Sequence, residues 1–138
     1  LTPLLFFAAA HPKVSVLMGG RTQEELFWEE IYRPHVQECF VTTDDGSYGT
    51  RGFVTTLLPR LLAGGSYDGV AVCGPPIMME RVAAIAAEYG IPCEVSLEKR
   101  MACGLGACLS CAVDTKSGRR KVCKDGPVFP AGEVYYAS

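Results

Sequence analysis

Apolar residues along the chain alternate between short continuous runs and longer stretches in which they recur at helical spacing. Short runs bounded by turn residues predict buried strands, and the longer stretches predict helices. The expected strands cover residues 14–18, 38–42, 69–73 and 91–96, and the expected helices cover residues 22–32, 53–62 and 76–89. Strands separated by helices predict an α/β fold built on a doubly wound parallel sheet.

Local signals mark where the expected helices begin and end. Thr22 and Glu25 have the spacing of a capping box at the start of the first helix. Pro59 lies inside the second helix and is expected to kink or end it. Pro76 suits the first turn of the third helix, and Gly90 is expected to end that helix. One apolar stripe of the third helix is expected to face the core: Met78, Val82, Ile85, Ala86 and Tyr89.

The alternation of strands and helices stops after Ser96, where glycine and cysteine become frequent. A basic turn, KSGRRK at residues 116–121, is expected to have a short strand on each side. We therefore predict two domains with a boundary near Leu97. An α/β domain covers residues 1–96, and a small C-terminal domain covers residues 97–138.

Composition excludes several classes of partner. Of the 138 residues 49% are apolar, and the net charge is −2, with no basic stripe, so a nucleic-acid partner is not expected. The longest apolar run, residues 4–10, is too short to span a membrane and does not have the flanks of a signal peptide. Seven cysteines form an odd set, and three of them stand singly in strand-like segments. This usage favours the reducing cytoplasm over a disulfide framework.

The densest chemical signal is a cysteine loop, CGLGACLSC, at residues 103–111. With a later fourth cysteine it gives the spacing C-x4-C-x2-C…C, which is typical of [2Fe–2S] sites. Gly104 and Gly106 allow backbone angles that let N–H groups approach the sulfur atoms. The fourth cysteine is expected on the return strand of a hairpin. The predicted ligands are Cys103, Cys108, Cys111 and Cys123.

Zinc and disulfide bonds are the competing interpretations of this loop. A structural zinc site usually has two C-x2-C pairs, and only one is present here. Disulfides would need an oxidising compartment and would not need the glycines. The spacing therefore favours the cluster, while a zinc-stabilised binding module without redox activity is kept as the alternative from another class. Cys39 and Cys93 are interpreted as small core residues.

Three loops follow the ends of the expected strands: MGGRT at residues 18–22, TTDDGSYG at 42–49 and CGPPIMM at 73–79. Ligands of doubly wound sheets bind at the carboxyl ends of strands, so these loops are candidate nucleotide sites. Gly74 leaves space for a flat ring, and the helix that begins at Pro76 favours a phosphate at its start. Arg21 fits either a surface ion pair or a contact to a ribose or phosphate. Asp44 and Asp45 fit either a turn or ribose hydroxyls.

Two of these motifs resemble a known family. CGPPIMM resembles the nicotinamide-side motif of the ferredoxin–NADP reductase superfamily. SLEKRMACGLGACLSCAV at residues 96–113 and VCKDGPVF at residues 122–129 closely resemble the electron-transfer subunits of class 1B dihydroorotate dehydrogenase. The resemblance covers nearly the whole chain and is strongest between residues 72 and 129.

The resemblance implies an oxidoreductase component of pyrimidine biosynthesis in the cytoplasm. In that family an NADH- and FAD-binding subunit carries a [2Fe–2S] cluster and pairs with a catalytic subunit that holds FMN, which implies a heterotetramer. Electrons would pass from FMN through the cluster and FAD to NAD⁺. No side chain of this chain is expected to act as a catalytic acid or base.

The resemblance also implies roles for individual residues. Residues 1–96 would be an NAD(P)-binding domain and residues 97–138 a cluster-binding domain. The segment KDGPVF at residues 124–129 would support the cluster loop and face the partner. The adenosine half of the nucleotide would contact Gly20, Arg21, Asp44, Gly46 and Ser47. The nicotinamide and flavin would contact Cys73, Gly74, Pro75 and Met78, and Thr2 would end the preceding glycine-rich turn.

The chain departs from the family at its start. The family begins with an FAD-binding barrel of about a hundred residues, an ordinary domain size, followed by a first parallel strand. Neither segment is in this sequence, so FAD is expected to bind mostly through the absent domain, and this chain alone is expected to be inactive. The alternative within the same fold is an NAD(P)-linked reductase subunit of a hydrogenase, sulfide dehydrogenase or transhydrogenase.

Overall fold

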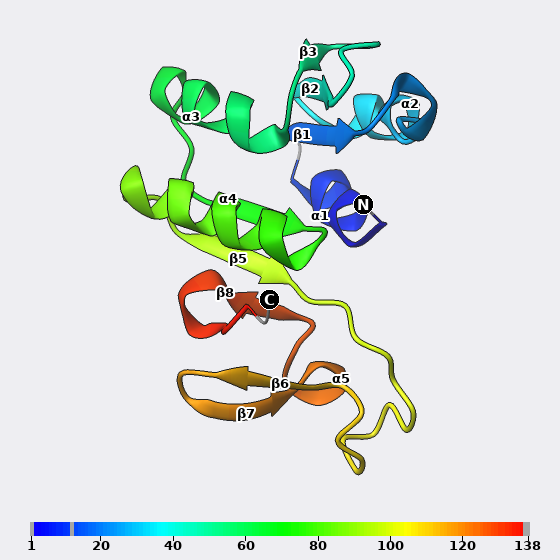
Figure 1. Ribbon diagram of the computed structural model, residues 1–138, viewed down its shortest axis with the longest axis vertical. Helices are drawn as coiled ribbons and strands as arrows, with labels where there is room; N and C mark the ends of the chain where they lie inside the picture. The colour runs from blue at the N-terminus through cyan, green and yellow to red at the C-terminus, as the bar shows by residue number, and fades with distance from the viewer. Residues whose placement is uncertain (1, 12, 137–138) are drawn as a thin grey trace. The chain divides into compact units, whose positions relative to one another are not determined.

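The computed structural model describes residues 2–11 and 13–136. The chain divides into two compact units, Leu1–Ser66 and Tyr67–Ser138 (Figure 1). Both units combine helices with parallel strands, so the expected mixed α/β fold is confirmed. Among the described residues, none of the helices combines the length and the apolar character needed to cross a membrane.

The first unit contains a three-stranded parallel sheet in the order β1-β2-β3. Its strands are β1 (Ser15–Gly20), β2 (Glu38–Thr43) and β3 (Thr50–Arg51). Its helical segments are α1 (Thr2–Ala10), η1 (Gln23–Glu25), α2 (Glu29–Tyr32), η2 (Arg33–His35) and α3 (Val54–Gly64). The buried apolar core joins helices to the first two strands through Ala8, Val16, Met18, Leu26, Tyr32 and Val41. The strands predicted at residues 14–18 and 38–42 are therefore confirmed.

The predicted helix over residues 22–32 is wrong, because this segment forms the separate turns η1 and α2. The N–H of Leu26 donates to the carbonyl of Gln23 at 3.1 Å, and the N–H of Glu29 donates to the carbonyl of Leu26 at 3.1 Å. These three-residue bonds close tight 3₁₀-type turns. The capping box is also wrong, since Thr22 makes no side-chain cap bond and Glu25 instead accepts the N–H of Arg21 at 2.8 Å.

Two further helices differ in how well the sequence marks them. Helix α1 was not predicted, because its run of leucine, phenylalanine and alanine has no polar face to give a helical period. Helix α3 confirms the predicted helix and continues beyond Pro59, so the proline does not end it. Leu58 and Leu62, four residues apart on α3, are both buried.

The second unit contains a three-stranded sheet in the order β4-β5-β8. Strands β4 (Val70–Cys73) and β5 (Cys93–Ser96) are parallel, and β8 (Val128–Pro130) pairs antiparallel with β5. Helix α4 (Pro76–Glu88) connects the parallel strands. The remaining elements are a hairpin of β6 (Ala112–Thr115) and β7 (Gly118–Lys121), the short helix α5 (Val122–Asp125) and the turn η3 (Ala131–Glu133) (Figure 1).

The strands predicted at residues 69–73 and 91–96 and the helix predicted at 76–89 are confirmed. Gly90, with φ 67°, follows the helix as expected. The predicted core stripe is partly wrong, because Met79 rather than Met78 is buried and Tyr89 is 41% exposed. Val82 and Ala86 of the predicted stripe are buried as expected, together with Met79.

The parallel strands lie in two three-stranded sheets within the described residues. Strands β1 and β4 each have a partner on one side, namely β2 and β5. Strand β8 follows Leu97 in the sequence and pairs with β5, which precedes Leu97. The doubly wound arrangement and the domain boundary near Leu97 remain predictions.

Candidate cluster loop and nucleotide loops

The cysteine loop connects β5 to β6 and contains no helix or strand between residues 97 and 111. Gly104 and Gly106 have φ angles of 66° and 79°, in the left-handed region that glycine adopts without strain. The hydroxyl of Ser110 donates to the carbonyl of Arg100 at 3.1 Å and so joins the two ends of the loop. Leu105 and Leu109 lie between the cysteines and are 84% and 62% exposed.

The loop brings the first two candidate ligands together. The N–H of Cys108 donates to the sulfur of Cys103 at 3.4 Å. This N–H, the N–H groups of Leu105 and Ala107, and the thiol of Cys108 lower the pKa of Cys103 to about 6. Backbone dipoles thus stabilise the thiolate form of Cys103. The thiolate is the form in which cysteine binds a metal.

Cys111 and Cys123 form a second thiol pair. The N–H and the thiol of Cys123 lower the pKa of Cys111, and the same thiol contact raises the pKa of Cys123. Opposite shifts fit a pair that shares one proton, with Cys123 as donor and Cys111 as acceptor. The N–H of Val122 also donates to the carbonyl of Cys111 at 3.1 Å and holds the two segments together.

Cys123 lies in the short helix α5 and not on the return strand of the hairpin, so that part of the prediction is wrong. The strand β7 ends at Lys121, because the N–H of Lys121 donates to Oδ2 of Asp125 at 2.7 Å and starts a helical turn. The Nζ of Lys121 donates to the carbonyl of Gly106. This cross-link between hairpin and loop was missed by the sequence reasoning, which treated the basic residues only as a turn.

The four cysteines form two pairs, an arrangement that a [2Fe–2S] cluster can use. Across residues 2–11 and 13–136, three or more His, Cys, Asp or Glu side chains do not gather closely enough to hold one metal ion. A [2Fe–2S] cluster instead divides four thiolates between two irons. The structure offers two thiol pairs, and the backbone N–H groups that surround their sulfurs match the needs of an anionic cluster.

In the first unit, hydrogen bonds join the loops that follow β1 and β2. The N–H of Asp44 donates to the carbonyl of Gly20 at 3.1 Å, and the N–H of Asp45 donates to the carbonyl of Arg21 at 3.2 Å. The N–H of Gln23 donates to Oγ of Ser47 at 2.9 Å. The structure therefore brings the candidate adenosine residues into one group of loops.

Asp45 is part of a tight turn in this group. Oγ and N–H of Ser47 donate to Oδ1 of Asp45 at 2.7 and 2.9 Å. These bonds lower the pKa of the Asp45 carboxyl below its ordinary value. Gly46, between the two, has a φ of 77°, which a glycine adopts readily. Asp45 therefore has the structural role that the sequence left open, while Asp44 remains a candidate for ribose hydroxyls.

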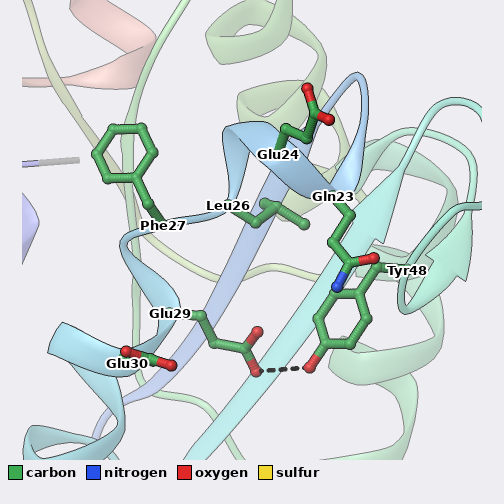
Figure 2. A pocket seen from close by; sticks show the side chains of 7 residues that line it. All are labelled: Gln23, Glu24, Leu26, Phe27, Glu29, Glu30 and Tyr48. Carbon is green, nitrogen blue, oxygen red and sulfur yellow. Dashed lines mark hydrogen bonds between the residues drawn. The ribbon is translucent and has the colours of Figure 1, made fainter.

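An open cavity of about 420 Å³ lies beside these loops (Figure 2). Glu29 at its base is 8% exposed; the O–H of Tyr48 donates to its Oε1 at 3.3 Å, and Arg33 forms an ion pair with it. Three carboxylates around the cavity disfavour a phosphate there. None of its lining residues was among the predicted ligands: Gln23, Glu24, Leu26, Phe27, Glu29, Glu30 and Tyr48.

In the second unit, Cys73 ends β4, and Gly74 and Pro75 lead into α4. A Cβ added to Gly74 would lie 2.3 Å from Cε of Met78, so the methionine covers the space that was expected to admit a flat ring. A methionine side chain moves readily, and a ring can reach this backbone when the methyl group turns away. Thr2 is exposed in the first turn of α1.

Comparison with known proteins places this geometry in context. Residues 98–135 match the family described as the iron-sulfur cluster binding domain of dihydroorotate dehydrogenase B. The probable dihydroorotate dehydrogenase B (NAD(+)) electron transfer subunit of Methanocaldococcus jannaschii is 40% identical over 129 residues, which are 94% of this chain and 49% of the relative. The chain is a relative of these electron transfer subunits. The corresponding subunit of Clostridium perfringens is 41% identical over 117 residues, 85% of this chain and 46% of the relative.

These matches confirm the resemblance that the cysteine motifs indicated. The chain spans about half the length of the curated electron transfer subunits it matches. A solved structure, described as NADH-dependent reduced ferredoxin-NADP oxidoreductase and studied for flavin-based electron bifurcation, aligns with a TM-score of 0.82. That match is 31% identical and covers 96% of this chain and 49% of the other. The fold is therefore that of a ferredoxin-reductase-like oxidoreductase.

Proposed function

We propose that Cys103, Cys108, Cys111 and Cys123 hold a [2Fe–2S] cluster. The two thiol pairs carry this proposal, since Cys103 with Cys108 would bind one iron and Cys111 with Cys123 the other. When bound, the cluster would accept and release one electron at a time. The protein contributes the thiolates, the thin glycine loop, and the N–H groups that face the sulfurs and stabilise negative charge.

The chain would serve as part of a dihydroorotate dehydrogenase B electron transfer subunit. In this role it relays electrons from FMN in a catalytic subunit, through the cluster and FAD, to NAD⁺ for pyrimidine biosynthesis in the cytoplasm. The names of the relatives and the matched cluster-binding family support the proposal. A heterotetramer of two subunit types is part of it. The exposed Leu105 and Leu109 on the cluster loop offer an apolar face for the catalytic subunit.

The nucleotide would be held by the two groups of loops. Gly20, Arg21, Asp44, Gly46 and Ser47 would bind the adenosine half of NAD, supported by the hydrogen bonds that join their loops. Cys73, Gly74, Pro75 and Met78 would face the nicotinamide and the flavin at the carboxyl end of β4. Thr2 would end the glycine-rich turn of a cofactor site. FAD would bind mostly through a separate N-terminal domain, and residues 1–138 alone would be inactive.

This function fits the doubly wound parallel sheet that the order of strands and helices predicts. Residues 1–96 would form the NAD(P)-binding domain and residues 97–138 the cluster-binding domain. The family match over residues 98–135 supports that boundary.

The test is the visible absorption of protein purified without oxygen. We expect a brown protein with bands at about 400–600 nm, the region where [2Fe–2S] centres absorb. Cys108→Ser should lose these bands, because a hydroxyl replaces one thiolate of the first pair. The matched control is Cys93→Ser, outside the loop, which should keep them. A colourless parent protein with one equivalent of zinc would refute the cluster.

A second candidate function differs only in the partner. The solved relative named as a ferredoxin-NADP oxidoreductase favours a subunit that exchanges electrons with another redox protein. Affinity purification of the full-length protein separates the two candidates. An FMN-containing dihydroorotate dehydrogenase subunit in the complex would support the first, and a ferredoxin- or hydrogenase-linked partner would support the second.

A further inference from the structure

Lys121 joins the hairpin to the cluster loop across fifteen positions of sequence. It is the last residue of β7, and its own N–H is fixed by Oδ2 of Asp125 at 2.7 Å. Its side chain is partly buried, and its Nζ donates a hydrogen bond to the carbonyl of Gly106. One end of the residue is thus anchored in the hairpin and the other end in the loop.

Gly106 lies between the first two cysteines of the loop. Its φ of 79° is in the left-handed region, and a Cβ there would lie 3.1 Å from Cδ of Lys124. The N–H of Gly106 faces the sulfur of Cys123, while its carbonyl faces Lys121. The carbonyl and the N–H of Gly106 belong to adjacent peptide planes joined at one Cα, so holding the carbonyl restricts the rotation that would turn this N–H away from a candidate ligand.

We propose that Lys121 is a positioning residue that fixes the Gly106 peptide beside the cluster and whose positive charge raises the cluster's reduction potential. This inference rests on the proposed function of the four cysteines. Reduction adds one electron to the cluster, with no bond made or broken and no proton moved. The added negative charge is stabilised by a nearby ammonium, and by the N–H groups that the ammonium holds in place.

The ammonium of Lys121 contacts the loop backbone, and the charged groups near it have other partners or are exposed. Asp125 uses its Oδ2 to accept the N–H of Lys121, at the hairpin end of the residue. Arg119 forms an ion pair with Asp114 on the hairpin. Lys124 is exposed, and only its alkyl chain would approach a Cβ added to Gly106.

The test uses the full-length protein with its cluster assembled without oxygen, in four variants. Lys121→Met removes the charge and the donor, Lys121→Gln removes the charge and keeps a donor, and Lys121→Arg keeps both. Lys116→Met is the matched control, because Lys116 lies in the turn at the other end of the four-residue strands β6 and β7. The readouts are the reduction potential from a dye-coupled titration and the exchange rate of the Gly106 amide.

We expect Lys121→Met to shift the ratio of reduced to oxidised cluster about tenfold toward the oxidised form, which is about 59 mV for one electron. Lys121→Gln should lower the potential to a similar extent but leave the Gly106 amide protected. Lys121→Arg and Lys116→Met should keep the parent potential. If Lys121→Met loses the fold, Lys121→Gln carries the potential measurement alone.

Two results would overturn the inference. In the first, the parent assembles a cluster, but Lys121→Met and Lys121→Gln have the same reduction potential as Lys116→Met. Lys121 then has no such role, while the cluster assignment stands. In the second, the parent binds no cluster at all. The proposed function then fails, and the role of Lys121 fails because it depends on that function.

Discussion

Ser47 connects the two loops of the first unit, because its hydroxyl accepts the N–H of Gln23 and donates to the carboxylate of Asp45. Its own N–H donates to the same carboxylate oxygen. Three hydrogen bonds therefore meet at one short side chain. This residue, rather than the charge of Asp45 alone, determines the shape of the turn between β2 and β3.

Ser47→Ala should raise the pKa of Asp45 toward its ordinary value, because the alanine removes the side-chain donor that lowers it most. In the parent, the lowered pKa makes Asp45 stabilise the fold above the ordinary carboxyl range, and this contribution is lost as the pH falls through the lowered value. In the variant, the loss should be smaller and should be complete at a higher pH, because the folded-state pKa lies closer to the ordinary value. Carboxyl-carbon NMR titration of Asp45 measures both values.

Ser66→Ala, in an exposed segment, is the control for this titration. It should leave the pKa of Asp45 unchanged. An Asp45 carboxyl that titrates identically in the parent and in Ser47→Ala would contradict the assignment of the hydrogen bonds.

At the residue scale, the sequence predicts what depends on near neighbours. The spacing of the cysteines and the left-handed angles of Gly104 and Gly106 are local properties, and both glycine predictions are confirmed. The contact of Lys121 with Gly106 spans fifteen positions and depends on how the hairpin meets the loop. No local pattern encodes that meeting, so the sequence did not reveal it.

At the scale of elements, tertiary contacts decide where the patterns fail. The stretch over residues 22–32 has good helix formers, yet Leu26 enters the core while the next residue, Phe27, stays 68% exposed. Three-residue hydrogen bonds then replace a regular helix. The strands were found because each is a short apolar run between turn residues, a signal that packing reinforces.

The junctions of two elements differ in their tolerance of a methyl group. Gly49, just before β3, has a φ of 65°, and a Cβ there would lie 2.4 Å from the carbonyl oxygen of Val41 on β2. Gly49→Ala should lower the free energy of unfolding by about 1–3 kcal/mol, from backbone strain and the clash. Chemical denaturation measures the change.

Gly64→Ala is the matched substitution at the end of α3, where an added Cβ meets nothing within 4 Å. It should leave the free energy of unfolding unchanged or raise it by up to about 1 kcal/mol, since alanine is the better helix former. Equal destabilisation by both substitutions would show that neither backbone angle nor space at Gly49 matters.

At the scale of the whole chain, β1 and β4 each present one edge without a strand partner among the described residues. In parallel pairing, alternate amides of a strand point to opposite neighbours. Edge amides without a partner exchange with solvent more readily than those inside a sheet.

We therefore expect alternate amides of β1 and β4 to exchange rapidly in residues 1–138 and those of β2 and β5 to exchange slowly. Amide exchange followed by NMR measures these rates. Uniformly slow exchange of all β1 and β4 amides would contradict the assignment of these edges.

The sequence predicts the fold class of the chain better than it predicts how distant strands pair, for a physical reason. The mixed α/β class and the parallel pairs follow from the order of strands and helices, which the sequence displays. Which strands pair within a sheet depends on hydrogen bonds between distant segments, which composition and periodicity do not encode. The cysteine motif carried the functional prediction further than the fold pattern, because ligand spacing is a short-range property.

Leu105 and Leu109 have a consequence for the order of assembly. Both side chains belong to the same loop as three of the four proposed sulfur ligands, and both are largely exposed. A second subunit that settles on them would also close the approach by which iron and sulfide reach the thiols. Under the proposed function, we therefore expect the partner subunit to bind this loop after the cluster has been assembled.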